Sequence, residues 1–201
     1  SARADAVCAA ALFATAFRSN LHSHLDLAAE PAKLMRQLSL SLFTELDRAD
    51  MFITAQLAYL SADSLTLRTC GAGHGPLLMS DGIEVAEIGS DGPPLGVSED
   101  HEFAQHEIHL KGITHLLMHT DGLSDSSSSE AQITREMLHF WLRGTSVAGM
   151  DAWAARDSLR QMHRVFHESA RVRDDATFII LTRAHATIPS PNPQSLTHAS
   201  R

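Results

Sequence analysis

The spacing of apolar residues changes twice along this chain. Leucines recur every four residues from Leu34 to Leu46, which predicts a helix that begins at Pro31 and has one apolar stripe. Between residues 51 and 119, apolar and polar residues alternate in short runs, as is typical of strands. Helical spacing returns between 130 and 169. Helices on both sides of a run of strands favour an α+β layered domain with antiparallel sheets over a doubly wound parallel sheet.

Three further helices are predicted. The segment from Val7 to about Leu25 is apolar on nearly every face, so we expect a helix packed into a core rather than one lying on the surface. Two helices are expected near the carboxyl end, at about Glu130 to Leu142 and from Met150 to about Ser169, with a loop at 144–149 between them.

The predicted strands form a meander. The tight-turn pair Asp81-Gly82 indicates a hairpin between two of them. The strands are expected at 51–60, 64–70, 77–79, 83–85, 103–110, 115–119 and 176–182.

The size and composition indicate one domain. A chain of 201 residues with 44% apolar content can bury a single substantial core, which we place at residues 1–184. Residues 185–201 carry three prolines among Ser, Thr and Asn and cannot bury enough surface to fold, so a linker or free end is expected there.

The charge and the cysteines exclude several classes of protein. A formal charge of -8, from 16 basic and 24 acidic side chains, disfavours nucleic acid or an anionic membrane surface as the main partner. Cys8 and Cys70 lie far apart, which signals neither a zinc cluster nor a disulfide framework and suits a reducing cytoplasm. No apolar run reaches the roughly 18 residues that a membrane span needs.

Two acidic positions stand at the ends of apolar strands. Asp121 follows the strand at 115–119 and precedes Gly122, a placement that suits a ligand of a hard cation or an ordinary strand-to-loop turn. The pair Asp174-Asp175 precedes the last strand. Adjacent carboxylates repel one another unless they are solvated or neutralised, either by a cation or by nearby arginines in a salt-bridged turn.

His74 lies in a loop bracketed by Gly73 and Gly75, which exposes its imidazole. A single histidine of this kind serves either a structural or a catalytic role. The chain contains neither the GxSxG pattern of serine hydrolases nor the GxxxxGK[ST] phosphate loop, so those two classes lack support.

Four segments together resemble a known family. Taken in order, they resemble the SpoIIE/RsbU branch of the metal-dependent protein phosphatases, the protein phosphatase 2C superfamily, and the resemblance spans roughly residues 4 to 183. The four segments are Ala72-Gly73-His74-Gly75-Pro76, Gly92-Pro93-Pro94-Leu95-Gly96, His119-Thr120-Asp121-Gly122-Leu123 and Asp174-Asp175-Ala176-Thr177.

The resemblance implies a four-layer αββα sandwich, two antiparallel sheets flanked by helices, with a binuclear Mn or Mg centre at one edge. Asp121 and Asp174 match the family's catalytic metal ligands, while Gly122, Asp175 and His74 take supporting positions. Two cations of this kind lower the pKa of a bound water and neutralise the phosphoryl oxygens, so no covalent enzyme intermediate is needed.

The resemblance departs at the amino end. The family's bridging aspartate falls at Ser1 or just before it, so we expect either a truncated segment or a degenerate site, with Asp5 as a nearby carboxylate.

The resemblance implies a cytoplasmic serine/threonine phosphatase that acts on a phosphorylated anti-sigma-factor antagonist. The resemblance also implies a sensor or receiver domain upstream of the phosphatase domain, and a homodimer is a further expected assembly. The alternatives are a pseudophosphatase that only binds a partner protein, and a sensor domain of two helices and a sheet whose acids are accidental.

Overall fold

The computed structural model describes residues 2–63, 65–123, 133–167 and 175–183, with side chains described for all of these except residues 2–8 and 167. The predicted tail at 185–201 lies outside these residues. The helices are α1 (Ala2–Ser23), α2 (Pro31–Arg48), α3 (Arg135–Val147) and α4 (Ala152–His167), with short 3-10 turns at Leu25–Leu27 and Asp121–Leu123. The strands are β1 (Ala55–Leu60), β2 (Thr66–Ala72), β3 (Leu77–Ser80), β4 (Val85–Ile88), β5 (His106–His109), β6 (His115–His119) and β7 (Phe178–Thr182).

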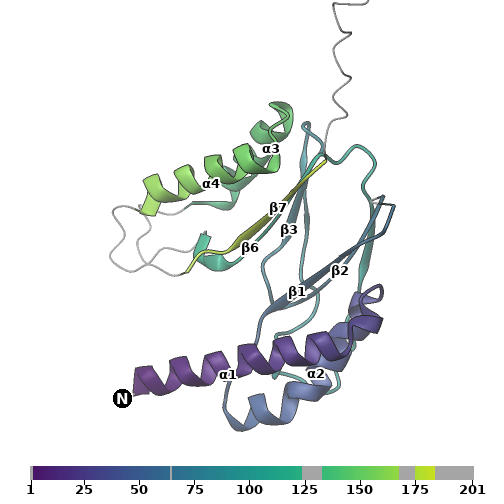
Figure 1. Cartoon of the computed structure of the whole chain (residues 1–201), viewed down its shortest axis with the longest axis vertical. Helices are drawn as coiled ribbons and strands as arrows, with labels where there is room; N and C mark the ends of the chain where they lie inside the picture. Colours follow the sequence, from purple (N-terminus) through teal and green to yellow (C-terminus); the bar gives the residue numbers. More distant parts are fainter. Residues whose placement is uncertain (1, 64, 124–132, 168–174, 184–201) are drawn as a thin grey trace, which may run out of the picture.

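The strands form two antiparallel sheets. One has three strands in the order β1-β2-β5, and the other has four in the order β4-β3-β6-β7. Figure 1 shows α1 and α2 on one side of the pair of sheets and α3 and α4 on the other. The predicted α+β sandwich of four layers is confirmed.

Three apolar clusters hold the layers together. The first joins the α2 stripe to the three-stranded sheet, and Leu38 and Leu46 in it are fully buried, as their spacing predicts. The second lies between the sheets and includes Leu67 and Leu77. The third packs α3 and α4 on the four-stranded sheet around Leu117.

The expectation that the first helix is buried on nearly every face is wrong. Phe13, Phe17 and Leu21 of α1 pack against the first cluster but are only partly buried. Leu12, on another face of α1, is 72% exposed. The many alanines of this segment make it apolar in composition, and that composition does not specify how many faces are covered.

Several predicted boundaries also need correction. Helix α3 continues to Val147 rather than ending at Leu142, because Thr145 and Ser146 in its last turn are buried against the sheet. The second strand of the Asp81-Gly82 hairpin begins at Val85 instead of residue 83. The Asp81 carboxylate accepts hydrogen bonds from the next two backbone N–H groups beyond Gly82, which lengthens the turn.

The pairing of β6 with β7 sets the position of the candidate site. The two strands are antiparallel, with His119 opposite Phe178, so the end of β6 and the start of β7 meet at one edge of the sheet. Within the described part of the chain, none of the helices combines the length and apolar character that crossing a bilayer requires.

Candidate active site

Asp121 stands where the sequence predicts, immediately beyond β6. Buried Leu117 and Leu123 lie on either side of it along the chain and anchor the strand and the turn that follows. The 3-10 turn closes with a hydrogen bond from Leu123 N to Thr120 O of 3.1 Å. The backbone N–H of Gly122 donates to Asp121 Oδ1 at 3.0 Å. The carboxylate is therefore exposed at a strand end but held by its own turn.

The segment before β7 lies directly against this turn. Thr120 N donates to Thr177 O at 2.9 Å, and Thr177 N donates to the Thr120 hydroxyl at 3.0 Å. A Cβ atom placed on Gly122 would lie 2.8 Å from the carbonyl carbon of Asp175. Gly122 thus allows the two strand ends to touch, which brings the exposed residues Asp121 and Asp175 to one edge. Asp174 lies outside the described residues.

His74 connects the loop at 73–76 to the end of β6. Its Nε2 donates to the carbonyl oxygen of His119 at 3.1 Å, and its Nδ1 lies 3.4 Å from the Thr54 hydroxyl. Since a carbonyl oxygen only accepts, Nε2 carries a proton. In this structure His74 shapes the loop by holding backbone next to Asp121.

The glycine-proline loop at 92–96 packs against the loop that carries His74. Gly73 N donates to Gly92 O at 2.7 Å, and Gly73 adopts a positive φ of 64°. A Cβ at Gly73 would also lie 2.7 Å from Cδ of Pro94. Two of the segments that carry the family resemblance therefore pack on each other.

His119 is a site residue that the sequence reasoning missed. Its Nδ1 lies 3.1 Å from the carbonyl oxygen of Thr120 and donates to it. Burial lowers the pKa of His119, so the imidazole is neutral near pH 7. Its position at the end of β6, directly before Thr120-Asp121, is the sequence signal that could have identified it.

A cavity of about 330 Å³ adjoins the same edge, and we call it the edge pocket. It is lined by Pro76, Leu78, Glu87, His119, Ile133, Thr134, Arg135 and Leu138. Three charged or titratable side chains form a cluster beside it: the Glu87 carboxylate accepts hydrogen bonds from Arg135 and from His139. No local sequence pattern indicates this cluster, because Arg135 and His139 lie 48 and 52 residues after Glu87 in the chain.

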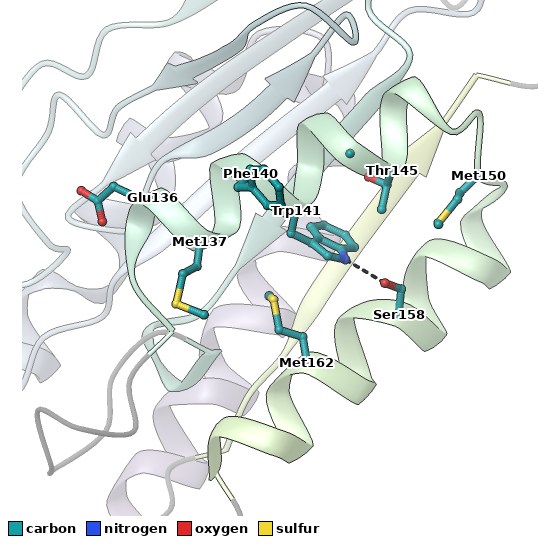
Figure 2. Close-up of a pocket in the computed structure, with 9 residues that line it drawn as sticks. Glu136, Met137, Phe140, Trp141, Thr145, Met150, Ser158 and Met162 are labelled. Carbon is teal, nitrogen blue, oxygen red and sulfur yellow. Dashed lines mark hydrogen bonds between the residues drawn. The ribbon is translucent and has the colours of Figure 1, made fainter.

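The larger described cavity, of about 490 Å³, lies between α3 and α4, away from Asp121. Figure 2 shows Trp141 and Met162 facing each other across it, with Trp141 Nε1 donating to Ser158 Oγ at 3.0 Å. Its lining is apolar apart from Glu136 and two hydroxyl groups, so it offers little for metal or phosphoryl chemistry.

The donors at the edge fit a hard cation in type. Carboxylate and backbone oxygens are the ligands that Mg²⁺ and Mn²⁺ take in proteins. Within residues 2–63, 65–123, 133–167 and 175–183, no group of three or more His, Cys, Asp or Glu side chains is placed to hold a metal ion. The described residues thus supply part of a ligand set, centred on Asp121.

Comparison with solved structures identifies the fold. The SiaA-PP2C domain of Pseudomonas aeruginosa is 19% identical with a TM-score of 0.70, over 87% of this chain and 70% of that one. The phosphatase domain of SpoIIE from Bacillus subtilis, presoaked with Mn, is 17% identical with a TM-score of 0.52, over 87% and 74%. RsbX in complex with magnesium is 13% identical with a TM-score of 0.57, over 84% and 71%. The crystal structure of the RsbU and RsbW domains of Rv1364c from Mycobacterium tuberculosis is longer, and this chain spans 48% of it.

The family assignment rests on a separate comparison. The search of curated proteins gives no match. Residues 8–184, however, match the family model described as Stage II sporulation protein E (SpoIIE). The chain therefore belongs to the SpoIIE family, and it has the fold of the PP2C-type serine phosphatases.

Proposed function

We propose that this chain is the catalytic domain of a metal-dependent protein serine/threonine phosphatase that hydrolyses phosphoserine. The observation that carries the proposal is the contact between the turn at Asp121 and the segment at Asp175, joined by the Thr120–Thr177 hydrogen bonds. Family membership supports the reaction class.

A divalent Mn or Mg ion would be held by Asp121 together with Asp174, with Asp175 in support. When bound, such ions lower the pKa of a coordinated water and offset the charge of the phosphoryl oxygens. The chain's own residues have other tasks. Gly122 lets the two acidic segments approach, and His74 fixes the backbone of His119 beside them.

The proposed substrate is a phosphorylated anti-sigma-factor antagonist, by analogy with the family. An upstream sensor or receiver domain, a homodimeric assembly and a cytoplasmic location belong to the same proposal. The negative formal charge of -8 supports a protein partner over nucleic acid.

The test compares Asp121→Asn with the unchanged chain in Mn-dependent phosphate release from a phosphoserine protein. The substitution removes a charge and almost no volume, so we expect turnover to fall at least about a hundredfold while the circular dichroism spectrum stays the same. Asp47→Asn is the matched control, because Asp47 is an exposed acid in the last turn of α2, outside the four segments that carry the family resemblance. An Asp121→Asn variant with full activity would refute the assignment.

A second candidate is a pseudophosphatase that binds a partner without turnover. Family membership is compatible with it as well, since membership establishes the fold but not turnover. Calorimetry with Mn²⁺ separates the two functions. Metal binding that Asp121→Asn removes supports the enzyme, whereas neither metal binding nor turnover in the unchanged chain supports the pseudophosphatase.

A further inference from the structure

The edge pocket has walls that suit an apolar side chain. Leu78, Ile133 and Leu138 are each at most 2% exposed, and they form its apolar surface together with the half-buried Pro76. Leu78 belongs to β3 and Leu138 to α3, so the sheet and the helix fix their backbones, while Pro76 and Ile133 lie just before these two elements. A volume of about 330 Å³ leaves room for one large side chain.

The charged group in the wall is already neutralised. The Glu87 side chain is 17% exposed, and its oxygens accept from Arg135 Nε, Arg135 Nη2 and His139 Nε2. Burial acts to raise the pKa of Glu87, but the hydrogen bonds from Arg135 and His139 outweigh it and keep the carboxylate ionised. Glu87 is therefore occupied as an acceptor, and its main effect is to hold Arg135 against the pocket.

The pocket is connected to the candidate metal ligand through His119. His119 forms part of its wall and is two residues before Asp121 in the chain, so their Cα atoms are at most about 7 Å apart. An extended peptide advances by about the same distance in two residues. A phosphoserine at Asp121 would consequently place a side chain one or two positions away at the mouth of the pocket.

We propose that the edge pocket is a specificity site that binds an apolar side chain of the phosphoprotein within two residues of the phosphoserine. The inference rests on the proposed phosphatase function. Arg135 acts in it as a positioning residue, because it lines the pocket and its guanidinium is fixed by Glu87.

The first experiment measures kcat/KM with phosphoserine decapeptides that carry Leu or Ala at each position from two before to two after the phosphoserine. At one of these positions we expect the Leu peptide to exceed the Ala peptide roughly tenfold. Arg135→Ala should reduce that contrast to less than about threefold and lower kcat/KM for the Leu peptide more than for p-nitrophenyl phosphate, which has no side chain to enter the pocket. Arg143→Ala, an exposed arginine on the same helix but outside the pocket, should preserve the contrast.

The second experiment does not need turnover. A set of phosphoserine decapeptides carries a photoreactive diazirine leucine at each position in turn from two before to two after the phosphoserine, and cross-links are mapped by mass spectrometry. Cross-links to Pro76, Ile133 or Leu138 support the site, even in a chain that shows no phosphatase activity, whereas cross-links to the groove between α3 and α4 overturn it. The proposal is also overturned if the Leu and Ala peptides have equal kcat/KM at every position. The same holds if Arg135→Ala loses the same fraction of its activity on the Leu peptide and on p-nitrophenyl phosphate.

Discussion

The close approach at Gly122 yields a quantitative prediction for Gly122→Ala. The added Cβ would lie 2.8 Å from the carbonyl carbon of Asp175 and 3.2 Å from the nitrogen of Ala176. Both are backbone atoms, which cannot rotate aside, so the two strand ends must separate. Overpacking of this kind typically costs about 1–3 kcal/mol.

Separation would also weaken the hydrogen bonds between Thr120 and Thr177, each of which contributes about 1 kcal/mol. We therefore expect Gly122→Ala to lower the free energy of unfolding by about 2–4 kcal/mol, which corresponds to a fall in Tm of roughly 5–15 °C for a chain of this size. Differential scanning calorimetry measures the shift.

Two glycine controls separate crowding from the loss of glycine itself. At Gly75, on the same edge, the nearest atom to an added Cβ is His119 O at 3.9 Å, so Gly75→Ala should leave Tm nearly unchanged. Gly144 is within α3 and has open space around it, so Gly144→Ala should raise stability by up to about 1 kcal/mol. If Gly122→Ala melts within 1 °C (about the error of such a measurement) of the unchanged chain, the argument from close approach is refuted.

Two further predictions concern buried groups. Burial raises the pKa of the Cys70 thiol to about 11, and the charge of Asp91 acts in the same direction. Between about pH 8.5 and 11 only the unfolded thiol therefore ionises, which stabilises the unfolded state. A Cys8→Ser chain should thus lose roughly 1 kcal/mol of unfolding free energy per pH unit in this range. Urea midpoints at pH 8 and pH 10 measure this, and a midpoint that does not fall contradicts it. Ser158→Ala removes the acceptor of Trp141 Nε1–H and should cost about 1 kcal/mol, or roughly 2–4 °C in Tm. Ser41→Ala, on the exposed surface of α2, serves as its control. Equal Tm values for the two variants would show that the hydrogen bond from Trp141 to Ser158 does not stabilise the fold.

The sequence was most informative where a local pattern has one physical meaning. The leucine spacing of four in α2 corresponds to a single buried stripe, and Leu34, Leu38, Leu42 and Leu46 are all buried. The strand-end position of Asp121 is likewise local, since it needs only an apolar strand followed by glycine. Both could be read without knowing the rest of the fold.

Features that depend on distant contacts could not be read in this way. The Glu87 cluster joins β4 to α3, and nothing near Glu87 in the sequence indicates that Arg135 will reach it. The exposure of α1 depends on how it packs on α2 and the first apolar cluster, which its alanine-rich sequence does not encode. The roles of Asp121, Asp174, Asp175, Gly122 and His74 in catalysis stay predictions until the variants are measured.

The Thr120–Thr177 contact has a consequence for how the chain folds. These residues are 57 positions apart, and both α3 and α4 lie between them in the sequence. Forming the contact closes a long loop, which is entropically costly and slow relative to local hairpins such as β3–β4. The acidic edge should therefore be among the last parts to assemble, and a probe of metal affinity would report the final step of refolding rather than the collapse that precedes it.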